Sequence, residues 1–264
     1  MNITEKKQAL ENSLRSLGSV AVAFSYGVDS TFLLKSAHSV LGKNAVAVTV
    51  KSGVFPSKEF EGSVEFCKKE GIEQIVIETD ELKIDGFALN PPDRCYICKK
   101  SIFTQIKNAA KARGITNVAE GSNADDVNDY RPGMKAVREL GVLSPLLAAE
   151  LTKAEIRALS AEYNLPTSGK PSFACLATRI ATGEEITKEK LEKIEKAEDY
   201  LHCAGFSQVR VRLHGGSARI ETEKEDILRL ASLAQEVNAQ LKGIGFDFVS
   251  LDLGGYKTGS MNKI

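Results

Sequence analysis

Short apolar runs alternate with amphipathic segments over the first 165 residues of the chain. Runs rich in Val, Ala and Ile are typical of buried parallel strands, and they lie at residues 19–24, 45–50, 73–78 and 117–120. Segments with helical periodicity surround them, at residues 1–17, 29–40, 57–70, 95–113 and 151–163. This alternation predicts an α/β fold, in which helices cover both faces of a parallel sheet.

The pattern changes after residues 166–171 (PTSGKP), whose Pro, Gly and Ser content is typical of a domain boundary or hinge. Beyond this segment, helices are predicted at residues 188–204 and 224–241, and strands at 207–213, 218–221 and 246–251. We therefore expect an N-terminal parallel-sheet domain, residues 1–168, and a smaller C-terminal α+β domain, residues 169–264.

The composition of the chain limits the kinds of partner that we expect it to bind. The chain has 264 residues with 35 Lys+Arg and 35 Asp+Glu, so its formal net charge is zero. A surface dedicated to nucleic acid usually leaves a positive excess, so a nucleic-acid partner is not expected. No apolar run reaches the ~18 residues that a membrane span needs, and residues 1–17 lack the apolar core of a signal peptide. We expect a cytoplasmic protein with no membrane segment.

Residues 25–30 (SYGVDS) follow the first strand and open the first helix. Gly27 permits a tight turn, the helix N-terminus attracts anions, and the hydroxyls of Ser25 and Ser30 add donors, so the segment suits a phosphate. Asp29 would cap the helix or help to hold Mg²⁺ between phosphates. By spacing alone, an ordinary capped strand–turn–helix explains the pattern equally well.

A second polar segment follows the fourth strand, at residues 121–126 (GSNADD), with residues 129–133 (DYRPG) after it. Ligands in open α/β folds bind at the carboxyl ends of the strands, where this segment would lie. It is either a polar loop that caps a helix or a loop that faces a nucleotide or metal, with Asp126 as the candidate residue.

The five cysteines are an odd number, which does not favour a secreted disulfide framework. Cys95 and Cys98 form a C-x-x-C pair that suits zinc, redox chemistry, an iron–sulfur cluster or a core. With Cys175 they are one ligand short of a closed zinc site, whereas a three-ligand [4Fe–4S] cluster would leave one iron open for chemistry. Cys67 and Cys203 are expected to be structural.

Basic and acidic side chains mark the C-terminal part of the chain. Arg210 and Arg212 share one face of a strand because side chains alternate with a period of two. Two guanidinium groups side by side suit a phosphate or a dicarboxylate, or else they form a solvated face paired with glutamate, and Arg179 is a further candidate site residue. Glu198 and Glu221 are either metal ligands or surface charges.

These motifs carry a resemblance to known proteins. SYGVDS resembles the pyrophosphatase loop (PP-loop), Ser-x-Gly-x-Asp-Ser, of the ATP pyrophosphatases, and GSNADD resembles their Gly-x-Asn-x-Asp-Asp loop. From residue 25 to 221, the segments SYGVDS, GSNADDVNDYRPG, SPL, KPSFACLATRI and QVRVR…ARIE together resemble the LarE family. These ATP-dependent sulfur transferases make the nickel-pincer nucleotide cofactor of lactate racemase. The implied fold is a PP-loop domain, adenine nucleotide alpha hydrolase-like, plus a smaller C-terminal α+β domain.

The resemblance implies a reaction. ATP, with Mg²⁺, adenylates a carboxylate of pyridinium-3,5-biscarboxylic acid mononucleotide, and a sulfur nucleophile displaces AMP to give a thiocarboxylate. A second round converts the other carboxylate. By position, Ser25, Gly27, Asp29, Ser30 and Asp126 would bind the nucleotide.

The remaining implied roles fall in the C-terminal part. Arg179, Arg210 and Arg212 match positions associated with catalysis or the substrate phosphate. Glu198 and Glu221 match a suspected metal site. The implied partners are the small-molecule substrate and further copies of the chain, with a hexamer as the candidate oligomer.

Members of this family differ in the source of the sulfur that they donate. In sacrificial members, the cysteine that matches Cys175 gives up its own sulfur, becomes dehydroalanine, and has no accompanying C-x-x-C pair. This sequence has the pair, so it resembles the three-cysteine subgroup, in which Cys95, Cys98 and Cys175 would bind a [4Fe–4S] cluster that carries the donated sulfide. The alternatives are a sacrificial Cys175, a tRNA-thiolating enzyme of the same superfamily, and a non-enzymatic sensing module.

Four positions differ from the family pattern. Tyr26 stands where Gly is common, Thr178 stands where Ser is usual, and residues 181–182 (AT) replace Pro-Tyr before Gly183.

Overall fold

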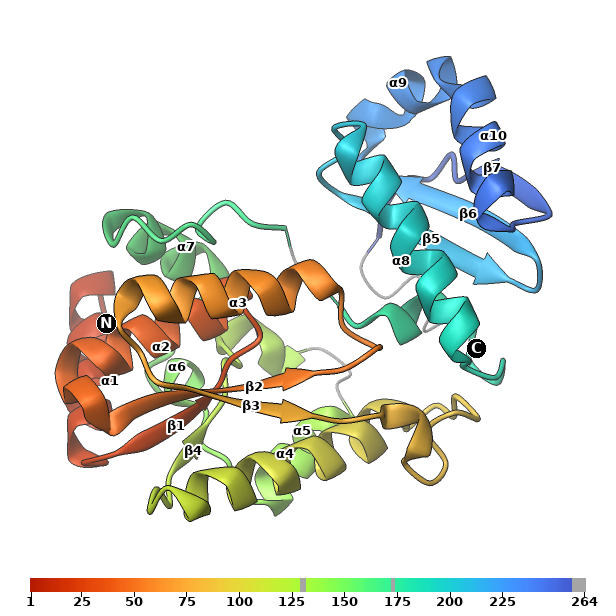
Figure 1. The fold of residues 1–264 in the computed structure, drawn as a ribbon. Coiled ribbons are helices and arrows are strands. Elements are labelled where there is room, and N and C mark those ends of the chain that lie inside the picture. The colour runs from red at the N-terminus through yellow and green to blue at the C-terminus, as the bar shows by residue number, and fades with distance from the viewer. Residues whose placement is uncertain (129–131, 172–173, 258–264) are drawn as a thin grey trace. The chain divides into compact units, whose positions relative to one another are not determined.

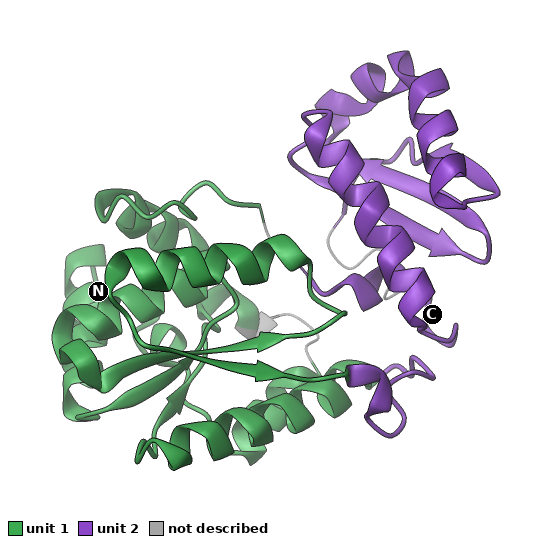
Figure 2. Cartoon of the chain, viewed as in Figure 1, with its two compact units in different colours: residues 1–80, 93–173 green, residues 81–92, 174–264 purple. Residues whose placement is uncertain are grey.

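The computed structural model describes residues 1–128, 132–171 and 174–257 (Figure 1). The motif residues 129–131 and 172–173 lie outside the described residues. The chain forms two compact units (Figure 2). The N-terminal unit comprises Met1–Asp80 and Asp93–Phe173, and the C-terminal unit comprises Glu81–Pro92 and Ala174–Ile264.

The N-terminal unit contains a four-stranded sheet of order β3-β2-β1-β4. Its strands are β1 Val20–Ala23, β2 Ala45–Lys51, β3 Gln74–Glu78 and β4 Val118–Ala119. Every pairing is parallel, with Val20 opposite Ala45 and Val48 opposite Ile75. The predicted α/β fold with a parallel sheet is therefore confirmed.

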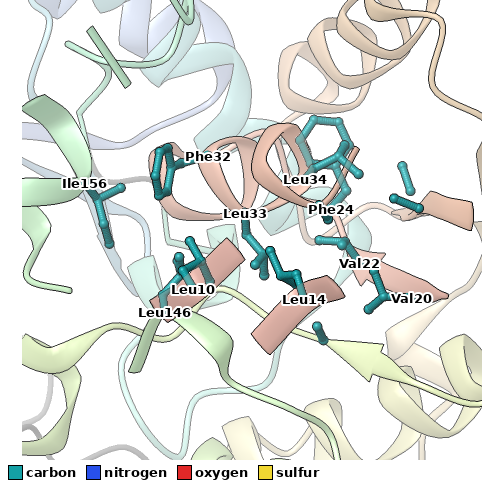
Figure 3. Packing of buried hydrophobic residues seen from close by; sticks show 14 of the residues in the cluster. Leu10, Leu14, Val20, Val22, Phe24, Phe32, Leu33, Leu34, Leu146 and Ile156 are labelled. Carbon is teal, nitrogen blue, oxygen red and sulfur yellow. The ribbon is translucent and has the colours of Figure 1, made fainter. Parts of the chain in front are cut away.

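Helices cover both faces of this sheet (Figure 1). They are α1 Ile3–Ser16, α2 Val28–Leu41, α3 Ser57–Glu70, α4 Arg94–Ala112, α5 Gly133–Glu139, α6 Pro145–Ala148 and α7 Lys153–Glu162. Alternate residues of β1 point to opposite faces. Val20 and Val22 join the cluster under α1, α2 and α7 (Figure 3), and Ala21 joins the cluster under α4. This packing holds the N-terminus of α2 at the carboxyl edge of the sheet.

The C-terminal unit contains a three-stranded sheet of order β5-β6-β7. Its strands are β5 Val209–His214, β6 Ser217–Thr222 and β7 Phe248–Leu251, and its α-helices are α8 Lys188–Cys203, α9 Ile227–Ser232 and α10 Ala234–Ile244. β5 and β6 are antiparallel, whereas β6 and β7 are parallel. Five short 3-10 helices complete the described chain: η1 Gly42–Asn44, η2 Glu81–Lys83, η3 Ala124–Asn128, η4 Leu176–Arg179 and η5 Lys224–Asp226.

Two features of this unit differ from the sequence pattern. The single helix predicted at 224–241 is divided at Leu233, whose N–H bonds to the carbonyl of Leu230 at 3.1 Å and tightens the turn. The segment Glu81–Pro92 belongs to the C-terminal unit, although the predicted N-terminal domain included it. The side-chain amide of Asn90 holds it there by donating to the carbonyls of Ile180 and Ala181, at 3.3 and 2.7 Å.

The two remaining cysteines differ in their surroundings. Cys67 of α3 is buried in the core, and burial raises the pKa of its thiol to about 12. Cys203 is exposed at the end of α8, so packing does not explain its presence. Among the helices in the described ranges, none is both long enough and apolar enough to cross a bilayer.

Candidate active site

The PP-loop joins β1 to α2 at the carboxyl edge of the parallel sheet. Gly27 is the N-cap residue of α2, and no side chain caps the helix there. The hydroxyls of Ser25 and Ser30 lie 3.1 Å apart, and the Thr31 hydroxyl donates to the Gly27 carbonyl at 2.7 Å. Two hydroxyls thus flank the positive end of a helix dipole, which is an arrangement suited to phosphate.

Asp29 does not cap α2, because it is the second residue of the helix. Its carboxylate instead accepts bonds from two other segments. The Asn123 side-chain amide donates to Oδ1 at 3.3 Å, and the ammonium group of Lys153 donates to Oδ2. Sequence reasoning did not single out Lys153. The available signal was its place directly after Thr152, which caps α7 through a capping box.

The second polar loop packs tightly against the beginning of α2. A Cβ at Gly121 would lie 3.1 Å from the backbone nitrogen of Ser30, which is closer than most Cβ contacts, so the packing favours glycine. Asp126 accepts from the Asn123 backbone N–H at 3.0 Å, which shapes the loop that brings the Asn123 side chain to Asp29. The two motif loops therefore meet at the carboxyl edge, as expected for ligand-binding loops.

Cys95 and Cys98 lie three residues apart in the first turns of α4, so their side chains share one side of the helix. Both are half-buried, and Arg94 Nη2 lies 3.9 Å from Cys95 Sγ. Two thiols in this arrangement fit two corners of an iron–sulfur cluster. Cys175 belongs to the C-terminal unit. Within the described residues, no group of three His, Cys, Asp or Glu side chains gathers to hold a metal ion, and the cluster stays a prediction.

The cysteine loop, residues 174–179, is held through its backbone carbonyls. The carbonyl of Cys175 accepts from the Thr178 N–H at 3.0 Å and from the Thr178 hydroxyl at 2.8 Å. Arg179 Nη1 donates to the carbonyls of Ala174 and Cys175, at 2.8 and 3.2 Å. A serine hydroxyl could make the same bond as Thr178, so this departure from the family pattern preserves the local geometry.

Arg179 is fully buried, and its guanidinium forms a bidentate pair with Glu198 of α8. Nε and Nη2 each lie 2.9 Å from a carboxylate oxygen. Glu198 Oε1 also accepts from the backbone N–H of Val211 at 2.9 Å. The guanidinium therefore connects the cysteine loop to α8 and, through Glu198, to β5.

A second buried pair joins the neighbouring strands β5 and β6. Arg212 Nε and Nη2 lie 2.9 and 2.8 Å from Glu221 Oε2, and Arg212 Nη1 donates to the Thr178 carbonyl at 3.1 Å. Glu221 Oε1 accepts from Arg219 at 3.0 Å. Glu198 and Glu221 thus serve as partners of arginines, and their role as metal ligands stays a prediction.

Arg210 adds a further buried guanidinium to this layer, and its Nη1 donates to the carbonyl of Val209 at 2.7 Å. It is 2% exposed, and its guanidinium lies 5.3 Å from the centre of the Tyr256 ring. Burial, and next the nearby charge of Arg179, lower the pKa of Arg210 to about 10. A buried cation whose charge is so disfavoured gains most from an incoming anion, so this position suits a phosphate.

The parallel sheet and the PP-loop at its carboxyl edge define an ATP-using enzyme of the PP-loop class. Similarity extends to a component of the glutamine-hydrolyzing GMP synthase of Thermoplasma volcanium, which is 26% identical over 213 residues, or 75% of this chain and 67% of that protein. No family model matches the chain.

Two relatives match almost the whole length. An uncharacterized protein of Synechocystis sp. is 38% identical over 265 residues, covering 99% of this chain and 98% of that protein. The pyridinium-3,5-bisthiocarboxylic acid mononucleotide synthase of Lactiplantibacillus plantarum is 37% identical over 261 residues, covering 98% and 95%. The chain belongs to the family of this synthase, the LarE family.

Proposed function

We propose that this protein converts pyridinium-3,5-biscarboxylic acid mononucleotide into the bisthiocarboxylic acid mononucleotide at the expense of ATP. A carboxylate resists nucleophiles until one oxygen becomes part of a good leaving group. Attack of that oxygen on the α-phosphorus breaks the bond to pyrophosphate. Sulfur then forms the C–S bond as the C–O bond to AMP breaks. The observation that carries this proposal is the PP-loop whose Asp29 is held by Asn123 and Lys153.

We assign the ATP phosphates to the PP-loop. Ser25, Gly27 and Ser30 supply hydroxyl and N–H donors at the positive end of α2. Asp29 and Asp126 supply carboxylate oxygens, which are the ligands that Mg²⁺ prefers. Lys153 supports this assignment, because its ammonium group pairs with Asp29 and would also compensate the negative charge of a bound phosphate.

We assign the substrate phosphate to the buried arginine layer of the C-terminal unit. Burial disfavours the positive charge of Arg210, which an incoming phosphate would stabilise, and Arg212 lies two residues further along the same strand. Arg179 acts by positioning Cys175, since its donors point at the cysteine loop and at Glu198. Glu221 orients Arg212.

The proposed sulfur carrier is a [4Fe–4S] cluster held by Cys95, Cys98 and Cys175. When bound, the cluster supplies the sulfide. The alternative is Cys175 as a sacrificial donor. Anaerobic purification with an iron and acid-labile sulfide count separates the two, since a cluster requires about four irons per chain. Cys95→Ala should abolish the iron, whereas Cys203→Ser, an exposed cysteine, should retain it.

No iron after anaerobic reconstitution would favour the sacrificial route. Mass spectrometry would then reveal the loss of one H₂S at Cys175 after a single turnover.

The reaction itself is tested by pyrophosphate release with the purified mononucleotide as acceptor and by mass spectrometry of the product. Two oxygen-to-sulfur exchanges per molecule support the proposal. Pyrophosphate release that depends on tRNA, together with retention of RNA on a filter, would instead identify a tRNA-thiolating enzyme. Light scattering measures the predicted homo-oligomer, for which a hexamer is the candidate.

A further inference from the structure

Tyr26 of the PP-loop has an unusual backbone conformation. Its φ is +57°, in the left-handed region that glycine adopts at little cost and other residues seldom occupy. This geometry explains why glycine is common at the position in related loops. Something in this chain must therefore hold a tyrosine there.

The Tyr26 side chain provides part of that support. Its ring lies over Gly62 of α3, where a Cβ would come within 2.2 Å of the ring. The rings of Phe24 and Phe66 lie 6.1 and 6.2 Å away, centre to centre. The chain thus accommodates the tyrosine through a matched glycine and an aromatic cluster.

Lys170 provides the remaining support for the backbone conformation of Tyr26. Its Nζ donates to the Tyr26 carbonyl at 2.9 Å and lies 4.1 Å from the centre of the Tyr26 ring. The same ammonium group pairs with Glu59 of α3 at 2.6 Å. One cation therefore contacts both the backbone and the ring of the strained residue, and its own charge is compensated.

The backbone around Lys170 is itself fixed. Arg157 of α7 donates to the carbonyls of Ser168 and Lys170, at 2.6 and 2.7 Å. Lys170 therefore extends from an anchored part of the segment 166–171, and the chain reaches Cys175 five residues later.

The contact determines the orientation of one peptide group. The described peptide bonds are all trans, so the N–H of Gly27 points opposite to the carbonyl of Tyr26. Because Lys170 binds that carbonyl, the Gly27 N–H is directed away from Lys170. We propose that Lys170 is a positioning residue that holds the PP-loop peptide between Tyr26 and Gly27 in the orientation that receives ATP phosphate. This inference rests on the proposed assignment of ATP to the PP-loop.

The test measures the Kd of ATP by calorimetry and the KM for ATP in pyrophosphate release. Lys170→Met should weaken ATP binding and raise KM by about tenfold, with a smaller effect on kcat, because the contact acts before chemistry. Lys111→Met, at an exposed position of α4, is the matched control and should leave both constants unchanged. Thermal unfolding of each variant measures its folded fraction.

A double-mutant cycle with Tyr26→Gly tests whether Lys170 acts through Tyr26. Glycine holds a positive φ without support, so adding Lys170→Met to Tyr26→Gly should cost less than threefold. An equal loss of ATP affinity in the wild-type and Tyr26→Gly backgrounds would overturn the inference. It would also be overturned if Lys170→Met only lowered stability and its folded fraction bound ATP normally. A wild-type protein that neither binds ATP nor releases pyrophosphate would refute the proposed function instead.

Discussion

Replacing Glu198 by Gln should destabilise the C-terminal unit far more than an ordinary loss of one charge. The substitution leaves the guanidinium of Arg179 fully buried with no carboxylate opposite its Nε and Nη2. Removing one partner of a buried ion pair typically costs about 3–5 kcal/mol, because the remaining charge is neither hydrated nor compensated. The glutamine oxygen can still accept the Val211 N–H, so the loss reports mainly on the charge.

The matched control lies on the same helix. Glu192 pairs with Lys188 at 3.7 Å, and the two side chains are 50% and 76% exposed. Such surface pairs contribute about 0–1 kcal/mol, so Glu192→Gln should change the free energy of unfolding very little. Urea denaturation followed by circular dichroism compares the two variants, and mass spectrometry of the product measures sulfur transfer.

The outcome also separates two roles for Glu198. If it pairs with Arg179, wild-type stability should not change when EDTA is added, and Glu198→Gln should impair sulfur transfer more than pyrophosphate release. A loss of less than 1 kcal/mol in Glu198→Gln would contradict the ion-pair reasoning. A wild-type protein that loses stability in EDTA would favour the metal-ligand role.

Three further predictions follow from the contacts and pKa shifts. Asp29→Asn should lower pyrophosphate release by about 100-fold or more, since we assign its charge to Mg²⁺; unchanged release would contradict this. Iodoacetamide at pH 8 should label the exposed Cys203 within minutes and leave Cys67 unlabelled in mass spectra, because burial raises the pKa of Cys67 to about 12. Burial lowers the pKa of Arg210 to about 10 from 12.5, so its charge carries a free-energy cost in the folded protein at pH 7. This cost is complete below pH 10 and is relieved as pH rises from 10 toward 12.5. Arg210→Met should weaken substrate binding in calorimetry, because it removes a cation that we assign to the substrate phosphate; unchanged binding would contradict the assignment.

Periodicity alone predicted most of the elements, because burial imposes it. The strand predicted at 45–50 matches β2 Ala45–Lys51, and the helix predicted at 57–70 coincides with α3. Both depend on continuous or amphipathic apolar patterns that one sequence displays directly. The division at Leu233 has no such signal, since the apolar pattern of residues 224–241 continues through it.

The candidate site was harder to predict wherever charge is buried. Along β5, arginines alternate with apolar residues, which suggested a solvated or ligand-binding face. Both faces are in fact buried: β6 supplies Glu221 to Arg212 of β5, and α8 supplies Glu198 to Arg179 of the cysteine loop. Sequence spacing carries no information on which helix contributes the compensating charge, and the contact between Lys153 and Asp29 was unpredictable for the same reason.

In both units, the candidate reactive loop is held by a cation that binds a backbone carbonyl and pairs with a glutamate. In the PP-loop, Lys170 binds the carbonyl of Tyr26, and Glu59 of α3 compensates its charge. In the cysteine loop, Arg179 binds the carbonyl of Cys175, and Glu198 of α8 compensates its charge. A cation that binds a carbonyl orients the peptide without occupying the space in front of the loop. In a sequence, such cations resemble residues that bind a substrate phosphate. Only their burial and their glutamate partners distinguish the positioning role, and the Lys170 and Glu198 variants test that distinction in separate units.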